Sequence, residues 1–207
     1  ITRCPLEIQD TLLSILSDRV MAVPEREGDK QVLYARVGFN IIATANTRDR
    51  GVNEMSAALK RRFNFETIPP IANITDEMAL VQRETDRHLQ RAGIPVSLTP
   101  NLTELLVTTF HELRSGKTSD GKALEPLSAV MSTAEAVSVG YAAGVRAYYY
   151  GTGQAAAQDI LQSLLGSALK ENAEDRERLR HYFTHVVRER QGQSWKGLYD
   201  AFRSVDF

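Results

Sequence analysis

The sequence predicts an α/β segment followed by an all-α segment. Short apolar runs of the kind that form strands lie in the first third of the chain, whereas apolar residues recur at helical spacing in the remainder. Between these parts, the adjacent Pro69 and Pro70 form a joint that a helix does not continue through. We therefore expect two domains, over 1–69 and 70–207.

The first segment is expected to hold a helix, a hairpin and a buried strand. Pro5 can occupy the first turn of a helix that extends to Ser17, with leucines along one face. Two short apolar runs, 20–23 and 31–37, flank a turn rich in Pro, Gly and Asp, which favours a hairpin. The apolar run 41–43 is too short for a helix and is predicted to be a central strand of a covered, parallel sheet.

The second segment is predicted to be a helical bundle. Thr99 can cap a helix whose first position is Pro100, because proline is tolerated where no backbone donor is needed. The other expected helices cover 75–92, 128–149, 154–169 and 173–191, and a last short helix would be capped by Ser194. A polar loop over 115–126 separates the second and third of these helices.

Composition favours a globular protein of the cytoplasm. The chain has 207 residues, 43% hydrophobic and 25% charged, with a formal net charge of −1. This charge gives no attraction toward nucleic acid or an anionic membrane. Cys4 is the single cysteine, which excludes an internal disulfide and suits a reducing compartment. The weakly polar stretch 129–150 is too polar for a membrane span.

Two groups of polar residues are candidates for chemistry. Asn46 follows the apolar run 41–43, and ligands of open α/β sheets bind beyond the carboxyl ends of the strands. Farther along, Lys60, Arg61 and Arg62 place three cations together, and arginine holds phosphate with a planar fork. An amide at a strand end, combined with an arginine supplied in trans, is a pair of groups that a phosphate-hydrolysing protein can use.

Simpler interpretations exist for both groups. Asn46 could cap the loop after a strand, and Arg61 and Arg62 could be a solvated pair. The pattern does not favour a nucleic-acid patch, since such patches usually combine several basic clusters with aromatic residues, and here one cluster is flanked by Glu54 and Glu66.

The stretches IIATAN at 41–46 and AALKRRF at 57–63 resemble the AAA+ ATPase family, in its MoxR type. By that resemblance Asn46 is the sensor 1 asparagine and Arg62 the arginine finger. The family usually has an acidic residue before the finger, where this chain has Arg61, so Arg61 is a second candidate. Residues 1–19 resemble the segment that directly follows Walker B. The resemblance thus implies the C-terminal part of a nucleotide-binding α/β domain plus a helical-bundle lid.

ATP and Mg²⁺ are the cofactors that the resemblance implies, bound mainly by a preceding part of the protein. The sequence contains no G-x-x-x-x-G-K-[ST] loop, because the tripeptide GKT at 116–118 has His111 where the motif requires glycine. It also contains no Walker B acidic pair. We expect this segment alone to be inactive, and residues 125–137 offer no sensor 2 arginine. The pair His181 and His185 is expected to lie on a solvated helix face and not to hold a metal.

The function implied by the resemblance is ATP hydrolysis at the subunit interfaces of a homo-oligomeric ring, hexameric by family analogy. Such a ring would act as a chaperone or remodelling motor on protein clients, von Willebrand A-domain proteins among them. Two alternatives stay open: a motor that acts on DNA, and an inactive helical protein-binding module.

Overall fold

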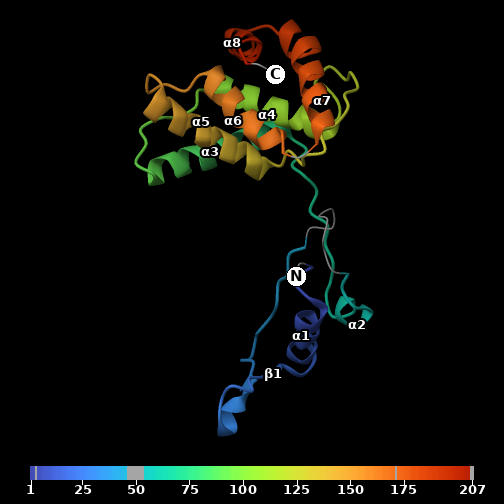
Figure 1. Cartoon of the computed structure of the whole chain (residues 1–207). Coiled ribbons are helices and arrows are strands. Elements are labelled where there is room, and N and C mark those ends of the chain that lie inside the picture. The colour runs from blue at the N-terminus through green and yellow to red at the C-terminus, as the bar shows by residue number, and fades with distance from the viewer. Residues whose placement is uncertain (3, 46–53, 171, 206–207) are drawn as a thin grey trace. The chain divides into compact units, whose positions relative to one another are not determined.

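A computed structural model of the chain describes residues 1–2, 4–45, 54–170 and 172–205. The chain divides into two compact units, Ile1–Ile68 and Pro69–Phe207. Figure 1 shows the ribbon of both units, with the long helices of the second unit labelled. The two units are described separately below.

The first unit contains a small antiparallel hairpin between two helical elements. Its elements are α1 (Leu6–Asp18), β1 (Val20–Ala22), a 3₁₀ turn (Gly28–Gln31), β2 (Val32–Tyr34) and α2 (Ala57–Lys60). The two strands pair with Met21 opposite Leu33. Arg19 ends α1 in the left-handed conformation, with φ 58°, and the chain passes directly into β1. The predicted first helix and hairpin are therefore confirmed.

The predicted parallel strand over 41–43 is not formed. Residues 41–45 belong to no strand, and the side chain of Ile42 is 93% exposed. A parallel strand requires a hydrogen-bonded neighbour and cover on both faces. The only sheet among the described residues is the two-stranded pair of β1 and β2. The apolar run therefore lacks the partners that would make it a strand.

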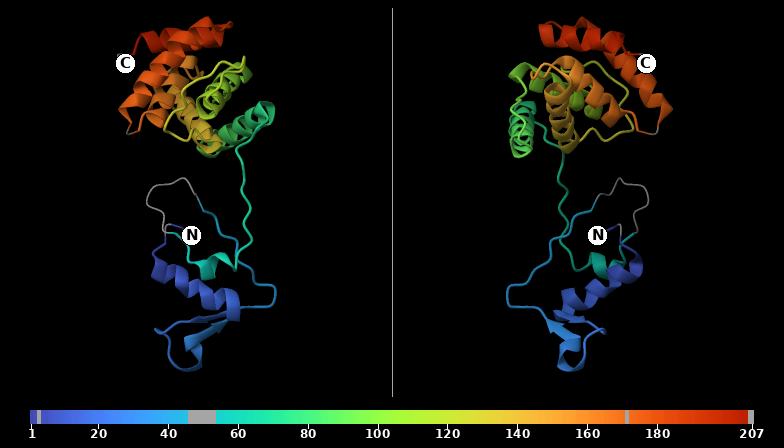
Figure 2. Two further views of the ribbon diagram at one scale, coloured as in Figure 1. Left: turned by 90° about the vertical axis from the view of Figure 1, so that its right-hand side faces the viewer. Right: turned by 60° about the vertical axis from the view of Figure 1, so that its left-hand side comes forward.

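The second unit is helical. Its elements are α3 (Ile74–Arg91), α4 (Pro100–Ser115), α5 (Thr133–Tyr150), α6 (Ala157–Ala168), α7 (Ala173–His185), a 3₁₀ turn (Val187–Glu189) and α8 (Gln193–Arg203). Figure 2 shows these helices gathered into one bundle. Within the described part of this unit, the only β-type pairing is an isolated bridge between Lys117 and Ala123. The predicted sequence of an α/β segment followed by an all-α segment is confirmed.

Side-chain caps explain where several helices begin. The Thr99 hydroxyl accepts a hydrogen bond from the Leu102 amide, with Pro100 in the first position, as predicted. The third long helix begins later than residue 128, because Ser132 and Glu135 form a reciprocal capping box.

The prediction that Ser194 caps the last helix is wrong. The N-cap of α8 is Gly192, at φ 107°, and no side chain caps this helix. Glycine takes such a backbone conformation without steric cost, so the chain can turn sharply after the 3₁₀ segment and start α8 two residues earlier.

Two glycines allow α3 and α5 to approach closely and in parallel. A Cβ added at Gly140 would lie 2.7 Å from Thr85 Oγ1, and one added at Gly144 would lie 2.7 Å from both Cδ atoms of Leu89. Both pairs are offset by 55 residues (140 − 85 and 144 − 89), so the two helices run in the same direction. Their C-terminal ends, at Arg91 and Tyr150, consequently lie at the same end of the bundle.

The core of the second unit combines aliphatic and aromatic side chains. The Phe183 and Phe202 rings stack with centroids 4.6 Å apart, joining α7 to α8. The largest fully buried side chains of this unit are Tyr182, Phe110, Phe183, Leu89, Leu105, Leu106, Leu113, Met131, Ile160, Leu161 and Leu164. These residues come from α3, α4, α6 and α7 and from the segment just before α5, and Leu198 of α8 is also fully buried.

Candidate functional site

The candidate arginines lie at the end of α2, a single helical turn packed on α1. Leu59 is fully buried and anchors this turn, and the Ser56 hydroxyl caps it by accepting a hydrogen bond from the Leu59 amide at 3.2 Å. Phe63, which follows the arginine pair, is only half-buried. A buried leucine at the third position of so short a helix gives too weak a periodic signal to be recognised in the sequence.

Arg62 is hydrogen-bonded within its own unit. Its Nε donates to Ser17 Oγ at 2.6 Å, and its Nη1 donates to the Ala58 carbonyl at 2.7 Å. These bonds attach the guanidinium to the last turn of α1 and to α2. The residue is nevertheless exposed, and its Nη2 has no hydrogen-bond partner among the described residues. A guanidinium has more N–H donors than these two bonds use, so Arg62 keeps donors free for a ligand.

The other two cations of this cluster differ from Arg62. Lys60 Nζ lies 2.8 Å from Glu54 Oε1, and its hydrogen bond and charge lower the pKa of Glu54. Arg61 contributes its backbone amide to the end of α2, bonding the Ala57 carbonyl at 3.2 Å. Its side chain is exposed and makes no hydrogen bond or ion pair with the part of the chain that the structure describes. Arg61 is thus the least constrained of the three.

Asn46 lies outside the described residues, so its position relative to Arg61 and Arg62 stays a prediction. The segment before it is attached to the start of the chain, since the amino group of Ile1 donates to the Thr44 carbonyl at 2.9 Å.

The tripeptide GKT forms the end of a helix and not a phosphate-binding loop. Gly116 is the left-handed C-cap of α4, with φ 69°. The Thr118 hydroxyl is buried, donates to Asp120 Oδ1 at 2.5 Å and accepts from the Lys122 amide at 2.9 Å. This hydroxyl is occupied by its own loop, which agrees with the predicted polar loop. The residues at this position therefore do not fit a nucleotide.

The start of α5 is held by an arginine that sequence reasoning missed. Arg114, from α4, donates to the Met131 carbonyl at 2.9 Å and pairs with Glu77 Oε2 at 2.7 Å. Its side chain is only 12% exposed. The third helix of the bundle thus has an arginine at its beginning, but the charge is committed to a buried carboxylate. The two residues are 37 positions apart, and no local pattern connects them.

The described residues lack two further features. They contain no group of three or more His, Cys, Asp or Glu side chains that could hold a metal ion. The His181 and His185 rings stack at 4.3 Å on α7. None of the helices that the structure describes is long and apolar enough to cross a membrane.

Comparison with known proteins adds the family. Residues 75–206 match the family model described as a YehL-like AAA+ ATPase C-terminal domain, and residues 1–63 match the AAA domain of the dynein-related subfamily. The chain is 51% identical over 204 residues to uncharacterized protein YehL of Escherichia coli (strain K12). The aligned region covers 97% of this chain and 55% of that protein. The chain therefore spans about half the length of the curated relative it matches. No solved structure matches it.

Both units thus match AAA+ families, and the first match ends at Phe63, directly after the arginine pair. The chain belongs to the AAA+ ATPase family and carries the C-terminal domain of its YehL-like members.

Proposed function

We propose that this chain contributes sensor 1, the arginine finger and the lid of a ring-shaped AAA+ ATPase that remodels protein partners. The observation that supports this most directly is the arginine pair at the end of α2. Arg61 and Arg62 are exposed, adjacent, and placed on a turn that the buried Leu59 fixes to α1. A residue that acts on a neighbouring subunit must be both exposed and held on a rigid element.

In this proposal the chain's own residues position and stabilise, as phosphoryl transfer requires. ATP with Mg²⁺ would be bound by a phosphate loop and an acidic pair that this sequence does not contain. Asn46 would orient the attacking water or contact the γ-phosphate. The arginine would reach into the site of the neighbouring subunit and stabilise the negative charge that develops during transfer.

Arg62 remains our candidate for the finger, and its hydrogen bonds favour that role. Ser17 and Ala58 hold Nε and Nη1, so the side chain is already oriented while Nη2 is left for a phosphate oxygen. Preorganised donors are effective because they need little rearrangement during the reaction. Arg61 is the second candidate, since its side chain has no hydrogen bond to another described residue to give up.

The remodelling role rests on the resemblance to MoxR-type proteins, which includes von Willebrand A-domain clients and a hexameric ring. The two rivals are a DNA motor and an inactive binding module. ATP turnover would exclude the inactive binding module. Stimulation of this turnover by DNA would favour the DNA motor over the ATPase that remodels protein partners.

Alanine variants test the proposal in a form of the protein that includes a phosphate-binding loop. Arg62→Ala should lower ATP turnover by roughly 10³-fold or more while ATP binding stays near that of the wild type. Lys60→Ala is the matched control on the same turn and should change turnover little, because Lys60 is engaged with Glu54.

The same variants also distinguish the two arginines. A greater loss in Arg61→Ala than in Arg62→Ala would assign the finger to Arg61. Full turnover in both variants would contradict the proposed arginine finger, whereas a wild-type protein without any turnover would favour the inactive binding module.

A further inference from the structure

The shared C-terminal end of α3 and α5 carries an exposed surface of tyrosine and arginine. Tyr148, Tyr149 and Tyr150 are 42%, 64% and 84% exposed. The rings of Tyr148 and Tyr149 meet edge to face at 4.9 Å. Arg87 and Arg91 are the exposed cations of the last turns of α3. We call these five residues the tyrosine–arginine face.

The composition of this face is that of a protein interface. Tyrosine and arginine are enriched where proteins bind one another, because they bury much area at a low entropic cost. Arg87 pairs with Glu84 at 2.7 Å, while Arg91 has no ion pair among the residues that the structure describes. The cluster of three exposed tyrosines points to a protein partner and not to a nucleic-acid backbone, which is bound mainly through several cationic contacts to phosphates. The expected occupant is therefore a protein surface that is apolar and acidic.

Such a surface is present elsewhere on the same unit. A groove of about 720 Å³ lies between α7, the end of α4 and the loop that follows α4. Its apolar floor includes Leu113, Leu124 and Tyr182. We call it the acidic groove because its edges carry Glu125, Glu174 and Glu177, whose side chains are 81%, 73% and 67% exposed.

The charge of the groove is complementary to the tyrosine–arginine face. Arg178 is the arginine among the lining residues, and it forms ion pairs with Glu125 at 3.2 Å and with Glu174 at 3.0 Å. Glu177 pairs with Arg180, which is not part of the lining. The lining therefore contains three carboxylates and one arginine. With His181 left out of the count, its net charge is negative.

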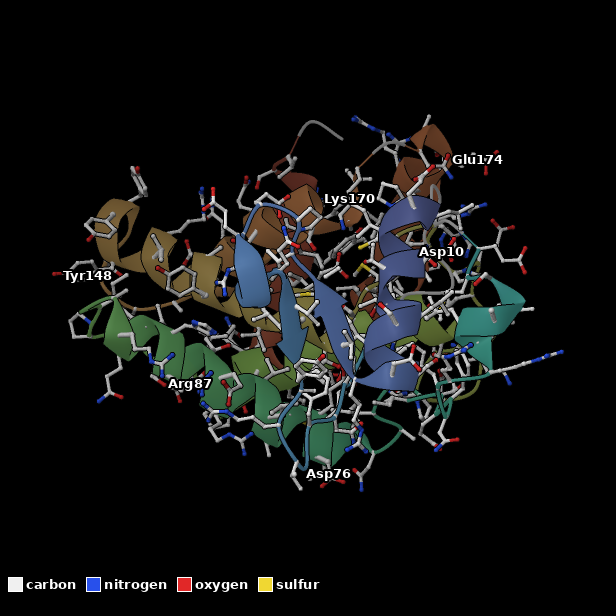
Figure 3. The ribbon with its side chains drawn as sticks, turned by 90° about the horizontal axis from the view of Figure 1, so that it is seen from below. Asp10, Asp76, Arg87, Tyr148, Lys170 and Glu174 are labelled. Atoms are coloured by element: carbon white, nitrogen blue, oxygen red, sulfur yellow. The ribbon has the colours of Figure 1, made fainter. Side chains whose placement is uncertain are left out.

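The two surfaces lie at opposite ends of the helical unit. Figure 3 shows Tyr148, on α5, and Glu174, on α7, on opposite sides of this unit. Complementary surfaces at opposite ends cannot satisfy each other within one copy. They can do so between copies in a head-to-tail arrangement, which generates a ring if the rotation closes.

We propose that the tyrosine–arginine face of one copy docks into the acidic groove of a second copy of this chain. The tyrosine rings would cover the apolar floor, and Arg87 and Arg91 would pair with the glutamates at its edge. This contact joins neighbouring helical domains, and it rests on the proposed ring assembly for its biological meaning.

Charge reversal provides a test in which two defects cancel. One variant, Arg87→Glu with Arg91→Glu, makes the face negative. The other, Glu125→Lys with Glu177→Lys, makes the groove positive. Each variant alone places like charges at the contact, and we expect its self-association to be at least roughly tenfold weaker than that of the wild type.

The mixture is the decisive measurement. In an equimolar mixture, the negative face meets the positive groove, and the native face of the second variant meets the native groove of the first. Sedimentation velocity of the 207-residue chain should show that association returns on mixing. Asp200→Lys reverses an exposed charge on α8 and should associate like the wild type. Circular dichroism verifies that each variant is folded.

Three results would overturn the proposal: variants that associate as strongly as the wild type, a mixture of folded variants that does not recover, and a wild-type chain that stays monomeric up to about millimolar concentration. In the last case the face would serve another partner. The readout is association and not turnover, so failure here leaves the assignment of Arg62 untested and intact. Conversely, Arg62→Ala should not alter this association.

Discussion

Glu77 is a buried carboxylate on which three helices of the second unit converge. Its side chain is fully buried on α3 and accepts hydrogen bonds from Arg114 of α4 at 2.7 and 3.0 Å and from Thr133 of α5 at 2.7 Å. Burial alone would raise the pKa of Glu77, but the hydrogen bonds from Arg114 and Thr133 together lower it below 4.5. The carboxylate is therefore charged and is the counter-ion of the largely buried Arg114.

We predict that Glu77→Gln destabilises the helical unit by about 3 to 5 kcal/mol, because it leaves the charge of Arg114 buried without a counter-ion. The variant keeps the shape of the side chain, so the loss reports the charge. Urea unfolding followed by the fluorescence of Trp195, the one tryptophan of the chain, measures it.

The matched control is Glu189→Gln. Glu189 lies 3.7 Å from Lys122, with both side chains largely exposed. Such surface pairs contribute about 0 to 1 kcal/mol, so this variant should unfold near the wild-type urea midpoint. It removes the same charge without leaving a buried cation.

The pH dependence follows from the lowered pKa of Glu77. The stabilisation is fully present above the unfolded value of about 4.5 and is lost as pH falls through the lower folded value. The difference in unfolding free energy between wild type and Glu77→Gln should therefore shrink as pH is lowered below 4.5. A destabilisation by Glu77→Gln of less than about 1 kcal/mol at pH 7 would refute the reasoning, because substitutions that remove no specific contact commonly cost that much.

Three further predictions concern packing and nucleotide chemistry. Gly144→Ala should destabilise the unit by about 1 to 3 kcal/mol, because its Cβ would meet the buried Leu89 at 2.7 Å. In the control Gly166→Ala, the new Cβ would meet nothing within 4 Å, so this variant should be neutral or stabilising. Equal urea midpoints for the two variants would contradict the close packing of α3 and α5. Asn46→Ala should lower ATP turnover by roughly 10²-fold while ATP still binds, and unchanged turnover would make Asn46 a loop cap. The 207-residue chain alone should show no ATP binding at micromolar affinity by calorimetry, since it lacks a phosphate loop, and such binding would disprove that account.

The helical unit could be predicted from the sequence because its signals are local. Thr99 followed by Pro100 sets the start of α4, and apolar residues at helical spacing continue from there. The strand expected over 41–43 failed for the opposite reason. An apolar run becomes a parallel strand only beside other strands, and the described residues do not supply them.

The candidate site shows the same division. The motif around Arg62 could be recognised from its sequence, and the structure places it on an exposed turn. Which arginine is hydrogen-bonded could not be predicted, since it depends on Ser17, 45 positions away. The pairing of Glu77 with Arg114 was missed because it requires α3 and α4 to be packed first. Contacts between distant residues are set by the tertiary fold and leave no periodic signal.

The most direct test of the proposed function mixes two kinds of defective subunit. One carries Arg62→Ala, and the other has an intact Arg62 but a disabled phosphate loop of its own. If the finger acts in trans, some interfaces of the mixed ring join an intact loop to an intact arginine, and ATP hydrolysis returns although neither variant is active alone. Absence of recovery, in mixtures proven to co-assemble, would contradict a trans-acting Arg62.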